Sequence, residues 1–150
     1  MQKILSYRKL LGVTEAAELK ELKTVYRNLI KDWHPDKFQD SEERKLEAET
    51  KSRKIIEAYH FLVSIAPETR ELTLPEYTQT ITAAGIVDFE YKHETLQINF
   101  SDGNVYEYFG VPKAIYVKLV NADSPGRFAR RHIYSSFVYR SVSKLAPANA

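Results

Sequence analysis

The sequence predicts a multi-domain chain: an all-α helical hairpin bundle followed by a small α+β domain with an antiparallel meander. Two observations lead to this fold class. The composition changes near residue 72, because seven of the ten tyrosines and four of the five glycines follow it. Apolar residues recur at helical spacing before that point and alternate, as in strands, after it. We place the first domain at residues 1–71, a linker at 72–80, the second domain at 81–145 and a tail at 146–150.

The first domain is expected to contain an amphipathic helix over residues 19–33. Its apolar residues step by three and four, as on one helix face: Leu19, Leu22, Tyr26, Leu29 and Trp33. A basic stripe lies roughly 125° around the same helix, formed by Lys20, Lys23, Arg27 and Lys31. One face can therefore pack while the other meets solvent or a partner.

Two further helices are expected beside it. A short one begins near Ile4 and is closed by Gly12, because glycine readily adopts the left-handed conformation that ends a helix. A longer one carries Ile55, Tyr59 and Leu62 at helical spacing. The two long helices would run antiparallel and bury a shared core.

The second domain reads as strands followed by helix. Leu96, Ile98 and Phe100 alternate with polar residues, and Tyr106 and Tyr108 alternate in the same way. The segment 101–104, Ser-Asp-Gly-Asn, is typical of a hairpin turn. About three strands are therefore expected, then a helix after Pro112 and a short amphipathic piece from Arg127 to Ile133.

Composition excludes several classes of protein. The net charge of +2 does not by itself indicate nucleic-acid binding, and the absence of cysteine excludes disulfides and thiolate metal sites. No apolar run approaches the roughly 20 residues that span a bilayer. Charged residues soon after Met1 break up any signal-peptide core, so we expect a cytoplasmic protein without membrane association.

The tripeptide His34-Pro35-Asp36 lies between the two long helices. Pro35 stops the first helix because it lacks an N–H and restricts His34. This leaves Asp36 in a loop, where its carboxylate can face outward. Taken alone, such a tripeptide also fits a helix-ending turn with a capping aspartate.

The surrounding sequence resembles a J domain, the DnaJ-like co-chaperone module of Hsp70, over about residues 4–71. Four segments carry the resemblance in order: 6–13 (SYRKLLGV), 22–29 (LKTVYRNL), 33–37 (WHPDK) and 55–62 (IIEAYHFL). Residues 67–70 are similar to the start of the family's short fourth helix. Ser6 and the segment 63–66 depart from the family's usual residues.

The resemblance implies that the chain docks on Hsp70 and stimulates its ATP hydrolysis without an ATP site of its own. It implies that Asp36 accepts hydrogen bonds from an arginine of Hsp70, with His34 and Pro35 holding the loop. The basic helix face would bind an acidic surface of Hsp70 through Lys23, Arg27 and Lys31, supported by Lys20 and Lys37. The alternative for any one lysine is an ordinary solvated helix face.

Residues 81 to about 142 resemble a KTSC domain, a small α+β module named for a C-terminal position in some lysyl-tRNA synthetases. The segments 96–112 (LQINFSDGNVYEYFGVP), 122–128 (ADSPGRF) and His132-Ile133 carry this resemblance. The domain would serve as a targeting or client module. The alternative is an RNA- or tRNA-associated module, with the J domain as an attachment point.

Basic charge in the second domain gathers near its end. Arg127, Arg130, Arg131 and Arg140 lie among aromatic residues, and no acidic residue occurs between 124 and 144. These arginines could contact phosphates while Phe128, Tyr134, Phe137 and Tyr139 stack on bases. Alternatively, the aromatic residues form core and the arginines are solvated.

Enzymatic chemistry is not expected. The histidines His34, His60, His93 and His132 are widely spaced and match no metal pattern. Ser124 lies near His132 and Asp123, but nothing marks a base or an oxyanion site. We therefore expect no catalytic residue, no metal and no cofactor.

Overall fold

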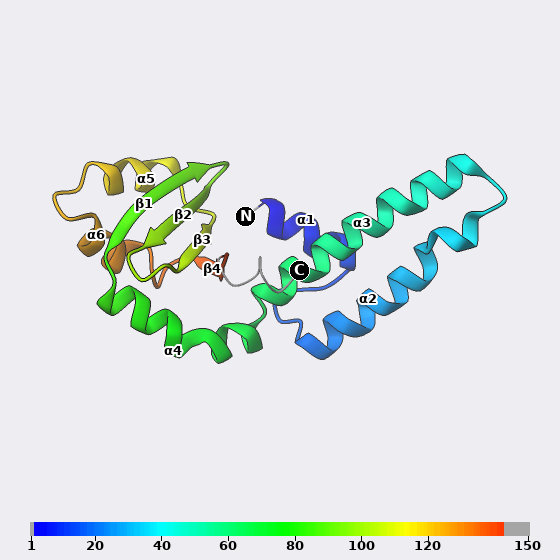
Figure 1. Ribbon diagram of the computed structural model, residues 1–150, viewed down its shortest axis with the longest axis horizontal. Coiled ribbons are helices and arrows are strands. Elements are labelled where there is room, and N and C mark those ends of the chain that lie inside the picture. Colours follow the sequence, from blue (N-terminus) through cyan, green and yellow to red (C-terminus); the bar gives the residue numbers. More distant parts are fainter. Residues whose placement is uncertain (1, 143–150) are drawn as a thin grey trace. The chain divides into compact units, whose positions relative to one another are not determined.

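A computed structural model of the chain describes residues 2–142 (Figure 1). The chain forms two compact units, divided between Arg70 and Glu71. The first is helical, and the second combines helices with a four-stranded antiparallel sheet. This confirms the predicted fold class. The predicted tail, 146–150, lies outside the described residues.

The N-terminal unit is a helical hairpin with a short helix beside it. α2 (Leu19–Trp33) and α3 (Glu42–Ser64) pack against each other, and Figure 1 shows them running in opposite directions. α1 (Gln2–Leu11) packs on α3. A 3₁₀ turn, η1 (Pro35–Phe38), lies between α2 and α3.

The hairpin buries a narrow seam of side chains. Leu22 of α2 is 2% exposed, and Ile55 and Ala58 of α3 are fully buried. The rings of Tyr26 and Tyr59 stack across the seam with centroids 4.1 Å apart. Most of the predicted apolar face of α2 is only half-buried. In a pair of packed helices, each helix buries only a narrow stripe of its surface against the other.

The helix ends of this unit follow from local chemistry. Gly12 adopts φ +71° after α1, and its N–H donates to the Lys9 carbonyl. At the start of α2 the carboxylate of Glu68 accepts a hydrogen bond from the backbone N–H of Leu19. An acidic group at that position also complements the positive end of the helix dipole.

The C-terminal unit is a sheet with helices on one face. The strands are β1 (Ile86–Lys92), β2 (Thr95–Phe100), β3 (Val105–Phe109) and β4 (Val138–Ser141), in that order. Between β3 and β4 lie α5 (Lys113–Val120) and α6 (Pro125–His132). The inner face of the sheet, including Leu96, Ile98 and Tyr108, packs with Leu119 of α5 and Ala129 of α6.

The sheet has one strand more than the sequence predicted. β4 has four residues, which is too short for a recognisable alternation. It pairs with β3, so that Tyr108 faces Tyr139 and Glu107 faces Arg140. This pairing joins segments about thirty residues apart, and local patterns carry no information about it.

The segment 72–80 differs from the expected linker, because it lies inside α4 (Pro67–Ala83). Tyr77 and Thr80 are 3% and 1% exposed. The Tyr77 ring stacks on that of Tyr139 with centroids 3.8 Å apart. Pro67 suits the first turn of a helix, and the packing of Tyr77 stabilises the helix despite the internal Pro75. The second half of α4 is therefore part of the C-terminal core.

Candidate functional site

The His34-Pro35-Asp36 segment forms a fixed turn at the end of α2. α2 ends at Trp33, and His34 adopts an extended conformation with φ −63° and ψ 130°. Pro35 then begins η1, where its missing N–H leaves no hydrogen bond unmade. The Lys37 N–H donates to the His34 carbonyl at 3.0 Å. The backbone of the tripeptide is therefore held by its own turn.

The side chain of Asp36 is presented to solvent. It is 74% exposed, and that of His34 is 53% exposed. The Asp36 N–H donates to Nδ1 of His34 at 3.2 Å. Nδ1 also lies 3.5 Å from Asp36 Oδ2, but a nitrogen that accepts the backbone proton cannot donate to the carboxylate. In this tautomer the carboxylate of Asp36 keeps both oxygens available to a partner.

Side chains of α3 contact the residues on both sides of the tripeptide and hold the loop in place. Ser52 Oγ donates to the Trp33 carbonyl at 2.8 Å. The rings of Trp33 and Phe38 stack with centroids 6.1 Å apart. Lys51 and Arg44 lie over the rings of Trp33 and Phe38, each at 5.5 Å. Sequence reasoning missed these supports, although the aromatic residues on both sides of the tripeptide could have indicated them.

The basic stripe of α2 lies on the face opposite the seam. Every basic residue predicted for this surface is exposed: Lys20, Lys23, Arg27, Lys31 and, in η1, Lys37. At about 100° per residue the four on α2 fall within one quadrant, while Leu22 points the other way. Among residues 2–142, none of the five forms an ion pair. The stripe is thus uncompensated positive charge leading along α2 to the tripeptide.

In the C-terminal unit the four predicted arginines do not form one cluster. Arg127, Arg130 and Arg131 are exposed on α6. Arg140 lies on β4, where its Nε is 2.9 Å from Oε1 of Glu107 on the neighbouring strand. Because Tyr139 points into the core, Arg140 lies on the opposite face of the sheet. Arg140 is therefore part of a cross-strand ion pair, separate from the arginines of α6.

The aromatic residues near these arginines are core residues. Tyr134 and Tyr139 are 5% and 7% exposed, and Phe128 and Phe137 pack against the same core. Burial raises the pKa of Tyr134 to about 12. These four rings are therefore engaged in core packing and are not presented for stacking on bases.

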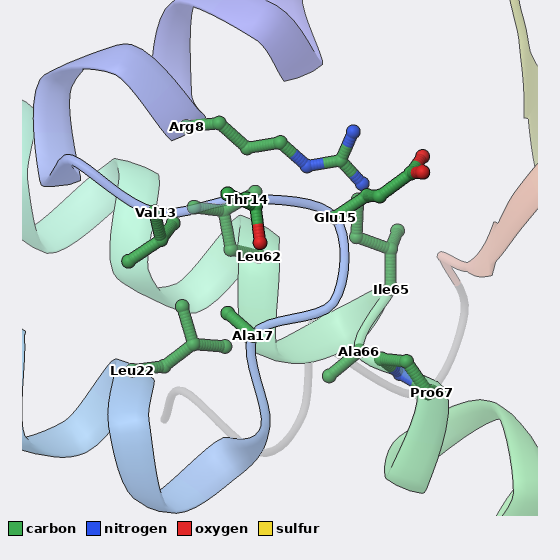
Figure 2. Close-up of a pocket in the computed structure, with 10 residues that line it drawn as sticks. All are labelled: Arg8, Val13, Thr14, Glu15, Ala17, Leu22, Leu62, Ile65, Ala66 and Pro67. Atoms are coloured by element: carbon green, nitrogen blue, oxygen red, sulfur yellow. The ribbon is translucent and has the colours of Figure 1, made fainter.

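One small cavity lies inside the N-terminal unit. A cavity of about 10 Å³ lies between the segment after α1 and the end of α3, lined by ten residues that include Arg8, Glu15 and Leu62 (Figure 2). That volume admits at most a single water molecule. Within residues 2–142 no group of three acidic or histidine side chains could hold a metal, and no helix could cross a membrane.

Comparison with known proteins agrees with the geometry of both units. Residues 6–72 match the DnaJ domain, and residues 82–137 match the KTSC domain. The chain joins a DnaJ domain to a KTSC domain. The tripeptide and the basic stripe both lie within the DnaJ domain, and α6 lies within the KTSC domain.

Individual relatives are similar to parts of this chain. The chaperone protein DnaJ of Thermoplasma volcanium is 42% identical over 83 residues, which is 55% of this chain and 19% of that protein. The DnaJ of Mesomycoplasma hyopneumoniae is 46% identical over 57 residues, 37% of this chain and 16% of the relative. The lysine–tRNA ligase of Nostoc punctiforme is 40% identical over 55 residues, 37% of this chain and 10% of the ligase. The chain thus spans less than a fifth of each relative.

Proposed function

We propose that this chain is an Hsp70 co-chaperone that stimulates ATP hydrolysis by Hsp70 through the His34-Pro35-Asp36 turn and the basic face of α2. The observation that carries the proposal is the Asp36 carboxylate, 74% exposed on a turn that α3 holds in place. The match of residues 6–72 to the DnaJ domain supports it. The KTSC domain would direct this activity to a client protein or to a cellular site.

Asp36 would act by pairing with an arginine of Hsp70. A carboxylate with both oxygens available can accept two parallel hydrogen bonds from a guanidinium group. Removing one partner of a desolvated charge pair costs on the order of 2–5 kcal/mol. His34 and Pro35 would fix the direction in which the carboxylate points.

The basic face of α2 would guide the encounter. Lys23, Arg27 and Lys31 are exposed and have no acidic partner among residues 2–142, so their charge is available to an acidic surface of Hsp70. Long-range attraction of this kind raises the association rate and weakens with salt. Lys20 and Lys37 would extend the positive surface at either end.

The alternative reading, an RNA- or tRNA-associated module with the J domain as an attachment point, has less support. Its expected contact set is divided between α6 and the Arg140–Glu107 pair, and its aromatic residues are buried or packed against the core. Of the four arginines expected to contact a polyanion, the three on α6 remain exposed.

The test is single-turnover ATP hydrolysis by a bacterial Hsp70 with this protein added. Wild-type protein should stimulate hydrolysis, and Asp36→Asn should reduce the stimulation at least about tenfold, equivalent to roughly 1.4 kcal/mol. Asp40→Asn is the matched control, because Asp40 is also exposed and follows η1. It should stimulate like the wild type.

The folded state of each variant is checked by circular dichroism, since surface changes usually alter stability by about 0.5 kcal/mol or less. If folded Asp36→Asn stimulates at the wild-type level, the proposed mechanism is wrong. Equal losses in Asp36→Asn and Asp40→Asn would likewise refute a specific role for the tripeptide.

A further inference from the structure

The α5–α6 region of the C-terminal unit concentrates positive charge. Residues 113–132 contain five basic residues and one acidic residue, whereas residues 73–112 contain one basic residue and six acidic ones. At about 100° per residue, Arg127, Arg130 and Arg131 fall within roughly 100° of one another on α6. All three are exposed, and Ala129 on the opposite side is fully buried. The arginines therefore share one solvent-facing surface.

The stability of α6 accounts for Arg130 and Arg131, which lie in the last turn beside the negative end of the helix dipole, but it does not account for Arg127. Arg127 lies in the first turn, which contains no acidic residue and where positive charge is unfavourable beside the helix dipole. Arg127 is also three and four residues from two like charges, which repel it along the helix. Within residues 2–142, none of the three arginines pairs with an acidic side chain. Charge that costs stability locally is expected where it serves binding.

α5, which packs beside α6, adds exposed apolar area and further positive charge. Val117 and Val120 are 45% and 46% exposed. Lys113 and Lys118 are exposed on the same helix. The first turn of α5, like that of α6, has no acidic residue. The two helices thus offer cationic groups together with aliphatic side chains.

We propose that the α5–α6 surface, formed by Arg127, Arg130, Arg131, Val117 and Val120, binds an acidic protein segment that carries aliphatic side chains. This rests on the targeting role proposed above for the C-terminal domain, and it names the chemistry of the target. Arginine pairs with carboxylates through two parallel hydrogen bonds, and arginine is enriched at protein interfaces. The valines would pack against aliphatic side chains of the segment.

The same observations favour protein over RNA. Single-stranded nucleic acid is bound by basic grooves that also present aromatic rings for stacking. On α6 itself the aromatic rings are those of Phe128 and His132, which pack on each other with centroids 4.7 Å apart, and Phe128 also packs against the core. Exposed valines contribute nothing to phosphate binding, but they contribute to a protein interface.

The experiment measures fluorescence anisotropy with the full chain and three probes of defined chemistry. The first is a labelled peptide of four Glu-Glu-Leu repeats, the second has serine in place of each leucine, and the third is a 12-nucleotide poly(U) RNA. Variant Arg127→Gln/Arg130→Gln/Arg131→Gln removes the charge of α6. Variant Lys23→Gln/Arg27→Gln/Lys31→Gln removes an equal charge from α2 as the matched control.

Wild-type protein should bind the Glu-Glu-Leu peptide more tightly than the RNA. The α6 variant should lose at least about tenfold in affinity for this peptide, and the α2 variant should stay within about twofold of wild type. Val117→Thr/Val120→Thr keeps the side-chain shape while adding hydroxyls. It should lower the affinity for the leucine-containing peptide by about threefold and leave the affinity for the serine-containing peptide unchanged.

Three results would overturn the inference: no detectable binding of the Glu-Glu-Leu peptide, equal losses in the α6 and α2 variants, or tighter binding of RNA that the α6 variant abolishes. The outcome is separable from the proposed co-chaperone activity. The α6 variant should stimulate Hsp70 like the wild type, whereas the α2 variant should not. Peptide binding by a wild-type protein that fails to stimulate Hsp70 would count against the proposed function and not against this surface.

Discussion

Replacing Tyr77 by phenylalanine tests whether the second half of α4 is part of the C-terminal core. The Tyr77 hydroxyl donates to the Tyr134 carbonyl at 2.8 Å and lies 3.0 Å from the Tyr108 hydroxyl. Burial raises the pKa of both Tyr77 and Tyr108 well above the usual value. The two hydroxyls therefore stay neutral, and their hydrogen bonds persist at any pH at which the protein is handled.

The expected cost follows from these two contacts. A neutral hydrogen bond contributes about 1 kcal/mol net, and a buried group left without its partner costs about 1–3 kcal/mol. The ring itself is retained, so its stacking on Tyr139 is unaffected and no large cavity forms. We expect Tyr77→Phe to lower the free energy of unfolding of the C-terminal unit by about 2 kcal/mol. For a unit of this size that corresponds to a fall in Tm of roughly 10 °C.

The chain allows the two units to be followed separately. Its single tryptophan, Trp33, lies in the N-terminal unit, and seven of its ten tyrosines follow residue 72. Denaturant unfolding monitored by tryptophan fluorescence therefore reports the first unit, and near-ultraviolet circular dichroism of tyrosine is dominated by the second. Tyr77→Phe should shift the tyrosine transition and leave the tryptophan transition in place.

Tyr116→Phe is the matched control for this experiment. Tyr116 packs half-buried against the same core, and its ring stacks on Tyr91, but its hydroxyl makes no hydrogen bond within residues 2–142. It should change stability by less than about 0.5 kcal/mol. If Tyr77→Phe is as mild as Tyr116→Phe, residues 72–80 behave as the linker first expected, and the structural reasoning is refuted.

Two further predictions concern the turns of the sheet. Burial alone would raise the pKa of Asp102, but hydrogen bonds, led by that from Thr80 Oγ1, outweigh it and leave the pKa lowered. The stability that Asp102 adds is therefore present above its unfolded pKa of about 3.9 and is lost as the pH falls through the lower folded value. In urea unfolding, wild type should exceed Asp102→Asn in stability at pH 7, and this difference should shrink by pH 3; a difference that grows in acid would contradict the assignment. His93 and Glu94 both adopt positive φ, 51° and 61°, in the turn between β1 and β2. Such a turn favours Asn-Gly, so the double substitution His93→Asn/Glu94→Gly should stabilise the C-terminal unit by about 1 kcal/mol in thermal unfolding. A lower Tm in the double variant would show that the positive φ values carry no strain.

The His34-Pro35-Asp36 turn could be predicted because its determinants are local. Pro35 restricts its own φ and the residue before it, so the end of α2 at Trp33 follows from covalent geometry. The supports behind the turn could not be predicted in the same way. Ser52 lies nineteen residues from Trp33, and its hydrogen bond exists only because α3 folds back along α2.

The sequence by itself determined the helical and strand periodicities, the split into a helical and an α+β part, and the exposed basic stripe of α2. Each of these depends on residues within a few positions of one another, where backbone geometry sets the spacing. Only the tertiary structure decided that Arg140 pairs with Glu107 and that α4 continues through residues 72–80. Arg140 and Tyr77 reach their partners on β3 from distant parts of the chain, and burial against those partners outweighs local signals such as Pro75.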